Sequence, residues 1–319
     1  MQVTPPDATA VAAFLDAIER LTNGDGARIL LAVSGGPDSL ALLLLAHAAM
    51  PDRISAATVD HGLRIEAADE ATFVARICEQ HGVSHVTLVP TEPIIGNIQS
   101  SARIARYRML HNAADAANCR WIATAHHADD QLETLLMRLM RGSGIDGMAS
   151  IRPRYGRVLR PLLAFDKSQL ETICANAAIE PVRDPSNDDK DFDRVALRQW
   201  LATSAHAFDT HRAVRTGAAL AEAAEALDWT AKLLAKDHLQ LETGFARLTP
   251  ADLPPELRRR LLKRALWHIE PGIEPRGDAI DRALVDLANG KRFTLGNVLC
   301  EAVGSENEIW HFRPAPPRR

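Results

Sequence analysis

The 319-residue sequence lacks the usual features of secreted proteins, membrane proteins and zinc-ribbon proteins. Its four cysteines lie far apart and form no C-x-x-C pair, so we expect reduced thiols and neither a zinc ribbon nor a disulfide scaffold. The N-terminus has no basic start followed by an apolar stretch, and the longest apolar run, at 40–50, is too short to span a bilayer. These absences predict a cytoplasmic protein without a membrane partner.

Strong net charge and aromatic side chains are also scarce. The formal net charge is −4 at pH 7 and aromatic residues make up 5% of the chain, so the composition gives no global sign of nucleic-acid binding. Basic residues nevertheless cluster at 138–160 and in "ELRRRLLKRAL" at 256–266. One such cluster alone is most simply a solvated face. Two of them on an acidic chain favour a polyanionic partner.

The first half of the chain alternates short apolar runs with helical patterns. The runs are rich in small and β-branched residues, as in buried strands, and lie at 28–34, 54–60, 85–90 and 121–125. The helical patterns lie at 38–50, 66–81, 97–118 and 128–140. This alternation predicts an α/β fold, a Rossmann-like parallel sheet with helices on both faces. Ligands of such sheets bind at the carboxyl ends of the strands.

After residue 209 the alternation of strand and helix patterns ends. A long Ala- and Leu-rich helical pattern covers 211–242, further helices follow at 250–269 and 278–290, and 291–313 has the pattern of a closing hairpin. We therefore expect a catalytic domain at 1–215. A smaller, mainly helical domain at 216–319 is expected to end in the hairpin and a short disordered tail.

The junction between the first strand and its helix consists of six small or polar residues: Ser34, Gly35, Gly36, Pro37, Asp38 and Ser39. The glycines let backbone N–H groups converge on an anion at the helix N-terminus, and the serine hydroxyls can donate to phosphate oxygens. The proline suits a first helical turn. An acid in this cradle makes sense if Mg²⁺ bridges it to phosphate, so Asp38 is the candidate metal ligand. The alternative without a ligand is a tight strand-to-helix turn that caps the helix.

Polar residues also stand where other strands end. Asp60 and His61 follow the second strand and His126 follows the fourth, so all three are expected to border a nucleotide pocket. Arg103 and Arg106, three residues apart, share one helix face. A single histidine is more often structural than catalytic, so His126 is assigned only to the pocket.

Two carboxylates begin the helical pattern at 128–140. Asp130 and Glu133 are three residues apart, and periodicity alone leaves helix capping and a functional role equally open. The glycines of "RGSGIDGM" at 141–148 favour a mobile loop that carries Arg141. "DPSND" at 184–188 precedes Arg194 and Arg198, and either an Asx-type turn with local pairing or a place near the active site fits these residues.

Together these stretches resemble the tRNA(Ile)-lysidine synthetases, a family of ATP pyrophosphatases, in order and spacing from the loop to 184–198. The resemblance implies an enzyme that binds ATP and Mg²⁺ and adenylates the C2 carbonyl of the wobble cytidine in the CAU-anticodon isoleucine tRNA. L-lysine then displaces AMP. Gln99 departs from the family, which often carries Glu there, and the end of the chain is expected to correspond to the shorter form.

The resemblance also implies roles for the candidate residues. Catalysis is assigned to Asp38, Arg103, Asp130 and Glu133. Lysine binding is also assigned to Asp130 and Glu133, because carboxylates stabilise the ammonium groups of lysine. ATP binding is assigned to Ser34, Gly35, Gly36, Pro37, Asp38, Ser39, Asp60, His61 and His126. tRNA binding is assigned to Arg106, Arg141, Arg194, Arg198, Arg258, Arg259 and Arg260.

Three questions stay open at this stage. Another tRNA-modifying ATP pyrophosphatase, such as a thiolase, shares the loop, although the scattered cysteines disfavour the redox type. A non-catalytic nucleotide-binding module is a further alternative, but it would not need Asp38, Asp130 and Glu133 together. A homodimer is considered, since the sequence does not report the oligomeric state.

Overall fold

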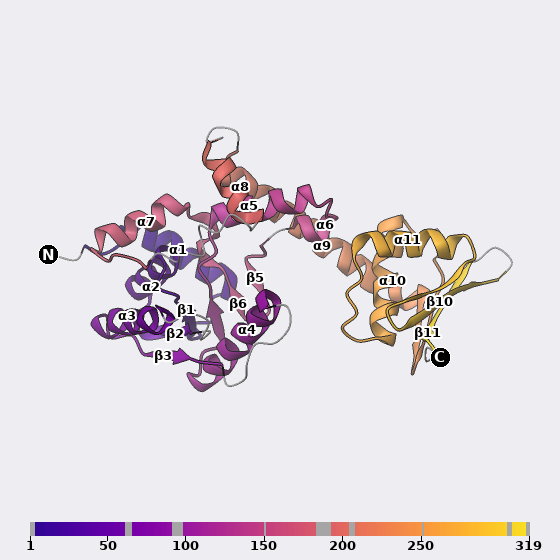
Figure 1. Cartoon of the computed structure of the whole chain (residues 1–319), viewed down its shortest axis with the longest axis horizontal. Coiled ribbons are helices and arrows are strands. Elements are labelled where there is room, and N and C mark those ends of the chain that lie inside the picture. The colour runs from indigo at the N-terminus through magenta and orange to yellow at the C-terminus, as the bar shows by residue number, and fades with distance from the viewer. Residues whose placement is uncertain are drawn as a thin grey trace. The chain divides into compact units, whose positions relative to one another are not determined.

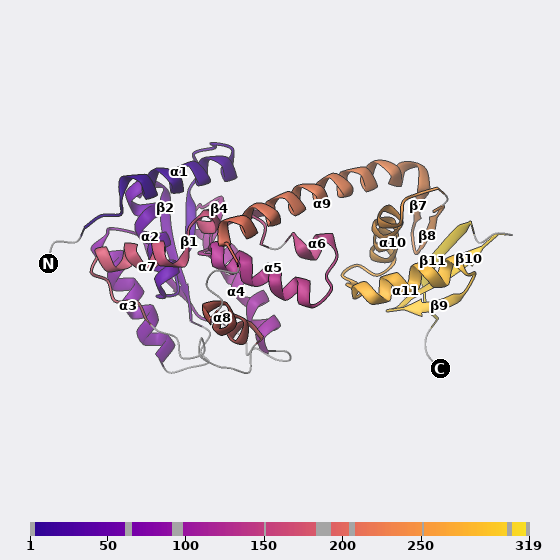
Figure 2. The same ribbon diagram turned by 90° about the horizontal axis from the view of Figure 1, so that it is seen from above.

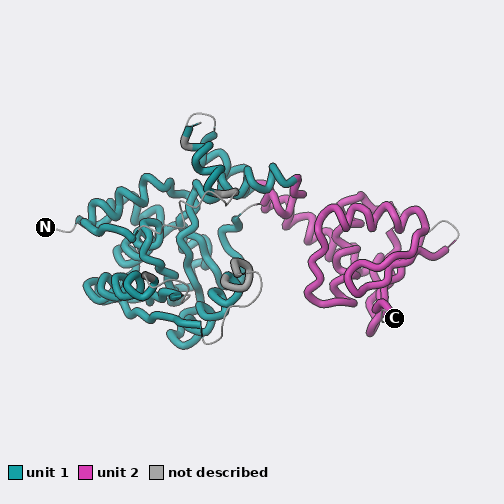
Figure 3. Tube along the Cα trace, viewed as in Figure 1, with its two compact units in different colours: residues 1–141, 150–218 teal, residues 142–149, 219–319 magenta. Residues whose placement is uncertain are grey.

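The computed structural model describes residues 4–60, 66–90, 98–149, 151–182, 193–203, 208–250, 252–304 and 308–316. The chain forms two compact units, which Figure 3 colours separately: residues 1–141 with 150–218, and residues 142–149 with 219–319. The boundary expected near residue 215 thus falls within helix α9 (Thr210–His238), which begins in the first unit and continues into the second. Residues 142–149, expected in the first domain, belong to the second unit.

The first unit is built on a six-stranded sheet of order β3-β2-β1-β4-β6-β5 (Figure 1). Its strands are β1 (Ile29–Ala32), β2 (Ile54–Val59), β3 (His85–Leu88), β4 (Trp121–Ala123), β5 (Arg154–Tyr155) and β6 (Val158–Leu159). All neighbouring pairs are parallel except β5 with β6. The predicted Rossmann-like fold is confirmed. The chain order reverses between β1 and β4, so their carboxyl ends flank a crevice of the kind in which such sheets bind ligands.

Helices cover both faces of this sheet (Figures 1 and 2). The first unit contains α1 (Ala8–Thr22), α2 (Pro37–Ala49), α3 (Glu66–Gln80), α4 (Ile98–Ala116), α5 (Ala128–Met140), α7 (Lys167–Asn176) and α8 (Asp193–Thr203), with 3₁₀ turns at Pro51–Arg53 and Pro161–Ala164. Of these, α5 and α8 pack against each other. Alternation along β1 assigns the faces: Ile29 and Leu31 pack with α1, α2, α3 and α7, whereas Leu30 and Ala32 pack with α4.

Helix α2 is the most buried helix of this layer. Its residues 39–46 are all buried. They lie between the sheet and the neighbouring helices α1 and α7, which both make extensive contact with α2. A helix that is apolar on every side is stable only in such a position. The burial of α2 fixes its N-terminus, and with it the loop at residues 34–39, against the sheet.

The second unit combines helices with a five-stranded antiparallel sheet of order β7-β8-β11-β10-β9. Its elements are α6 (Ile145–Met148), the later part of α9, β7 (Leu239–Glu242), β8 (Phe245–Leu248), α10 (Pro255–Ile269), α11 (Gly277–Ala288), β9 (Arg292–Leu295), β10 (Val298–Val303) and β11 (Ile309–Pro314). The predicted hairpin is thus part of a larger sheet. The prediction that the helical pattern continues to residue 242 is wrong, because Gly244 (φ +70°) turns the chain into the β7–β8 hairpin.

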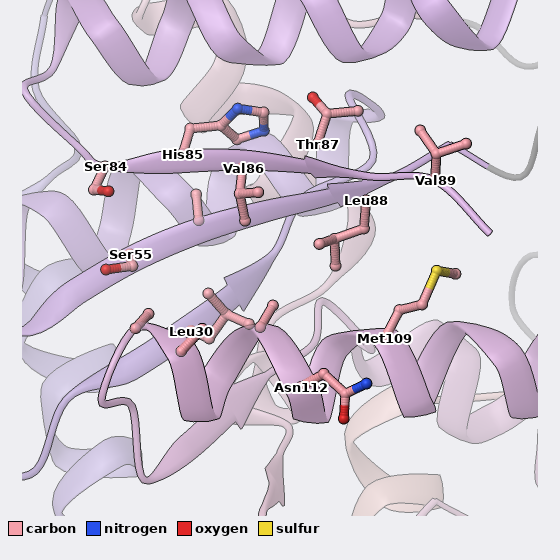
Figure 4. A pocket seen from close by; sticks show the side chains of 14 residues that line it. Leu30, Ser55, Ser84, His85, Val86, Thr87, Leu88, Val89, Met109 and Asn112 are labelled. Atoms are coloured by element: carbon pink, nitrogen blue, oxygen red, sulfur yellow. The ribbon is translucent and has the colours of Figure 1, made fainter. Parts of the chain in front are cut away.

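A groove of about 660 Å³ runs between the edge strand β3 and helix α4. Figure 4 shows Val86 and Leu88 directed toward α4, with Met109 opposite, while His85 and Thr87 point to the other side of the strand. None of the candidate catalytic residues lines this groove. Among the described residues, no helix combines the length and apolar character that crossing a membrane requires.

Candidate active site

The loop after β1 forms a closely bonded turn that leads into α2. Gly35 has φ +87°, which favours glycine, and Gly36 is the N-cap of α2 without a side-chain capping bond. The Ser39 hydroxyl accepts a hydrogen bond from the Ser34 N–H (3.1 Å) and donates to the Gly36 carbonyl (3.0 Å). The Val182 N–H donates to the Gly35 carbonyl at 3.0 Å. Hydrogen bonds within the loop and one from Val182 therefore fix its conformation. The N-terminus of α2 has a positive electrostatic potential that favours an anionic ligand.

A cavity of about 370 Å³ opens in front of this loop. It is lined by the loop, the end of β2, α3 and α4: Ala32, Val33, Ser34, Gly36, Pro37, Asp38, Ala57, Thr58, Val59, Ala67, Glu70, Arg106 and Val182. Arg106, assigned to tRNA from the sequence, thus lies on the wall of this cavity. Burial lowers the pKa of its guanidinium from the usual value, and the nearby Arg103 acts in the same direction.

The other residues expected to bind ATP lie near the strand ends. Asp60 follows β2 and donates its N–H to the Leu88 carbonyl at 2.9 Å. His126 follows β4 and its Nδ1 lies 2.9 Å from the Thr124 hydroxyl oxygen. Arg103, assigned to catalysis from the sequence, is exposed on α4, with its guanidinium carbon 5.1 Å from the centre of the Tyr107 ring. His61 lies outside the described residues, and its role stays a prediction.

The N-terminus of α5 carries an acidic cluster around a buried histidine that the sequence interpretation left unassigned. His127 is only 2% exposed. Its Nε2 lies 3.6 Å from Asp38 Oδ2 and 3.6 Å from Asp130 Oδ2, and its Nδ1 lies 3.4 Å from Asp129 Oδ2. Burial lowers the pKa of His127, but the carboxylates of Asp129, Asp38 and Asp130 outweigh it and raise the pKa to about 10. The ring is therefore a cation at neutral pH.

Arg198 of α8 extends this cluster to the second predicted carboxylate. Its Nε lies 2.6 Å from Oε1 of Glu133, a side chain that is only 5% exposed, and its Nη2 lies 3.6 Å from Asp130 Oδ1. Burial lowers the pKa of the Arg198 guanidinium, but these carboxylates hold it above its usual value. The sequence interpretation assigned Arg198 to tRNA. In the structure it belongs to a continuous chain of ion pairs: Asp38, His127, Asp130, Arg198 and Glu133.

A second cavity, of about 710 Å³, adjoins the far end of this ion-pair chain. Glu133 and Arg198 form part of its wall together with further charged groups: Asp129, Asp166, Lys167, Glu171, Asp209 and His211. Carboxylates outnumber cations in this wall. The cavity therefore suits a ligand with amino groups better than a second phosphate.

The oxygen atoms of Asp38 fit a bound Mg²⁺. Oδ2 faces His127, whereas Oδ1 is buried and has no hydrogen-bond partner among the described residues. A buried carboxylate oxygen without a partner is costly unless a ligand satisfies it, and Mg²⁺ prefers carboxylate and phosphate oxygens. The described residues contain no group of three or more side chains suited to a metal. Asp38 would therefore share the ion with phosphates and water, as is usual for Mg²⁺ at nucleotides.

Comparison with known proteins assigns this geometry to a family. A family model described as the PP-loop domain matches residues 9–205. A tRNA(Ile)-lysidine synthase of Zymomonas mobilis is 41% identical over 298 residues, which cover 91% of this chain and 89% of the relative. The chain belongs to the tRNA(Ile)-lysidine synthase family. A synthase of Novosphingobium aromaticivorans is likewise 41% identical, over 92% of this chain and 90% of its own. The predicted resemblance is confirmed, and as a member of this family the chain is a ligase.

Solved structures agree on the fold of this lysidine synthase family member. The U34-tRNA thiolase NcsA of Methanococcus maripaludis, a protein with a [4Fe-4S] cluster, superposes with a TM-score of 0.53 at 16% identity, covering 67% of this chain and 79% of the thiolase. At this identity the likeness concerns the fold alone. The present chain has four buried free cysteines, and burial raises the pKa of three of them, Cys78, Cys174 and Cys300, to about 12. None of these three is suited to thiolate chemistry.

The arginines assigned to tRNA in this family member have different environments. Arg141 is exposed at the C-cap of α5, and the side chain of Arg194 lies outside the described residues. On α10, the Arg258 Nε donates to the Leu253 carbonyl (2.7 Å), and Arg259 pairs with Glu256 and Asp281. Arg260 differs from both, and its contact with RNA stays a prediction. Its side chain is 5% exposed because Asp146, Asp228 and Glu256 enclose it at 2.5, 2.6 and 3.0 Å.

Proposed function

We propose that the chain is an ATP-dependent ligase that joins L-lysine to C2 of the wobble cytidine in the CAU-anticodon isoleucine tRNA. The C2 carbonyl oxygen attacks the α-phosphorus of ATP, the bond to the β-phosphate breaks, and pyrophosphate leaves. The ε-amine of lysine then attacks C2, the C2–O bond breaks, and AMP departs with that oxygen. The single observation that carries the proposal is the ion-pair chain from Asp38 to Glu133, which links a phosphate loop to an acid-lined cavity.

The first half-reaction is assigned to the loop and its cavity. Backbone N–H groups at the start of α2, the Ser34 and Ser39 hydroxyls and the Arg106 guanidinium would stabilise the charge that develops on the α-phosphate. Arg103, one turn before Arg106, stays a candidate for the same role. Asp38 Oδ1 would hold Mg²⁺, which neutralises phosphate charge when bound. Asp60, His61 and His126 are assigned to the nucleoside part of ATP.

The second half-reaction is assigned to Asp130 and Glu133. The Arg198 guanidinium, which contacts both carboxylates in the structure, marks the point at which a cationic group is stabilised. The ε-ammonium of lysine has the same charge and can donate to the same oxygens. As the amine attacks, it must lose protons, and one of the two carboxylates is positioned to accept one of them.

The remaining partners follow from the same proposal. A base in an anticodon loop can be unstacked at low cost, and the phosphates around it need basic contacts. Arg141, Arg194, Arg258 and Arg259 are the candidates for these contacts. A cytoplasmic location fits a tRNA substrate. A homodimer stays a prediction from the sequence.

Dependence of AMP release on lysine tests this function. The purified full chain is incubated with ATP, Mg²⁺ and a CAU-anticodon isoleucine tRNA transcript, with lysine, with arginine or with neither. We expect pyrophosphate release in all three mixtures, because adenylation precedes the amine, and stoichiometric AMP release only with lysine. AMP release at the same rate without lysine would contradict the proposal, as would a reaction that proceeds equally without tRNA.

A further inference from the structure

We propose that His127 is a positioning residue that ties the ATP-side carboxylate Asp38 to the amine-side carboxylate Asp130, so that both half-reactions share one fixed geometry. This inference rests on the proposed function. His127 makes the tie through one atom, since Nε2 lies 3.6 Å from Oδ2 of Asp38 and 3.6 Å from Oδ2 of Asp130.

The two carboxylates come from separate elements that only the sheet relates. Asp38 lies in the first turn of α2, after β1, and Asp130 in the first turn of α5, after β4. β1 and β4 are parallel neighbours, with Leu31 opposite Ala123, so both helices start at the same edge of the sheet. His127 is buried and lies close to both acids. Arg198 of α8 reaches Asp130.

His127 also determines which oxygens remain for substrates. It takes Oδ2 of Asp38 and leaves Oδ1 buried, with no hydrogen-bond partner in the part of the chain that the structure describes. Oδ2 of Asp130 accepts the backbone N–H of His127 at 3.1 Å and faces its ring, which leaves Oδ1 toward Arg198. Without the ring, the carboxylates of Asp38, Asp129 and Asp130, which are only partly exposed, would repel one another. We therefore expect both acids to turn away from their present orientations when the ring is removed.

A purely structural role makes a different prediction. If His127 only filled space at the start of α5, its replacement would lower the stability or the fraction of active enzyme. The apparent affinities for metal and lysine in the folded fraction would then stay unchanged. A positioning role changes these affinities even where the folded fraction is normal.

The test compares His127→Gln and His127→Asn with the wild type and with His81→Gln, a control histidine of the same unit that packs on His47 away from the cluster. The first measurement is Mn²⁺ binding, followed by the signal of free Mn²⁺, in the presence of a non-cleavable ATP analogue. The second is the lysine concentration that gives half-maximal AMP release. Active-site titration with tRNA and the melting temperature report the folded fraction.

We expect both His127 variants to weaken Mn²⁺ binding and to raise the half-saturating lysine concentration by about tenfold or more, the usual cost of losing a partner that orients a ligand group. His81→Gln should leave both unchanged. Wild-type values of both quantities in folded His127→Gln would overturn the inference.

If both single variants unfold, the double variants Asp38→Asn/His127→Gln and Asp130→Asn/His127→Gln are measured, because each removes one of the repelling acids. Recovery of folding in neither would overturn the tie between these groups. The proposed function is judged separately on the wild type: lysine-independent AMP release there would refute the reaction, whatever His127 does.

Discussion

At the residue scale, the two carboxylate oxygens of Asp38 have different surroundings. Oδ2 faces His127, whereas Oδ1 is buried and accepts no hydrogen bond from any described residue. His127 was not selected from the sequence, where His126 beside it was assigned to the pocket. Both histidines follow β4, and the sequence does not show in which direction each side chain points. Only the structure separates the buried His127, among three carboxylates, from the half-buried His126, which contacts Thr124.

Asp38→Asn is the first prediction at this scale. The substitution keeps the shape of the side chain but removes the charge that would hold Mg²⁺, so tRNA-dependent pyrophosphate release should fall by about 100-fold or more. Release is measured without lysine, to isolate the first half-reaction. Asp52→Asn, an exposed aspartate in the turn after α2, is the control and should behave as wild type. A loss smaller than threefold in Asp38→Asn would refute its assigned role.

Glu133→Gln should separate the two half-reactions in the opposite sense. A charge-assisted hydrogen bond to the amine is lost, worth about 1.5–3 kcal/mol, so the KM for lysine should rise by about 10- to 100-fold. Pyrophosphate release without lysine should stay within a few-fold of wild type, and the exposed Glu79→Gln serves as the matched control. Equal loss of both half-reactions would show that Glu133 does not act on lysine alone.

At the scale of elements, the short helix α6 forms an ion pair with a helix that lies far away in the sequence. Asp146 of α6 pairs with the buried Arg260 of α10, which also holds Asp228 of α9 and Glu256. The basic run "RRRLLKR" predicted a helix correctly, but not which arginine faces inward. The acidic partners lie 4, 32 and 114 residues away in the chain. The two more distant ones cannot be read from local pattern.

Arg260→Met should therefore destabilise the second unit. Three carboxylates would lose their common partner, and because they are partly exposed we expect a loss of about 1–3 kcal/mol in the free energy of unfolding. Chemical denaturation followed by tryptophan fluorescence measures it. Arg282→Met removes an exposed arginine of the same unit and its pair with Asp278, and should cost at most about 0.5 kcal/mol. Equal costs for the two variants would contradict the structural role of Arg260.

Secondary structure shows where local signals are sufficient. The predicted strands and helices of 28–140 match β1 to β4 and α2 to α5, because apolar runs and helical periodicity change clearly there. Helix α1 was not predicted, although Asp7 accepts the Thr9 N–H and Asn23 adopts φ 56° at its ends, two signals that mark helix termini. β7 was merged into a helix, because its pairing with β8 and the burial of Leu239 against the second core are long-range effects.

At the scale of the whole molecule, the chain has separate cores for its two units. One surrounds the parallel sheet and the other lies between α10, α11 and the antiparallel sheet. The proposed chemistry is confined to the first unit, and the candidate tRNA contacts Arg258 and Arg259 to the second. The assignment of tRNA contacts to the second unit rests on the basic run "RRRLLKR" and stays a prediction. The inclusion of 142–149 in the second unit was not predicted, because it depends on the contacts of Arg260.

Neutralising Arg258 tests the assignment of the second unit to tRNA. Arg258 donates a hydrogen bond to the Leu253 carbonyl and forms no ion pair with a described residue, so its charge is available to phosphate. Arg258→Gln should weaken tRNA binding and reduce the slope of log K against log salt by about 0.7–0.9 per lost phosphate contact. Filter binding over a range of salt concentrations measures both, with Arg282→Gln as the control. An unchanged slope would move the tRNA surface elsewhere.

The most direct test of the whole account follows isotope-labelled lysine into tRNA. The full chain is incubated with labelled lysine, ATP, Mg²⁺ and the CAU-anticodon isoleucine tRNA, and the tRNA is digested to nucleosides for mass spectrometry. We expect the label in one modified cytidine, at the wobble position, and only when ATP is present. Label-free nucleosides beside consumed ATP, or label attached elsewhere in the tRNA, would contradict it.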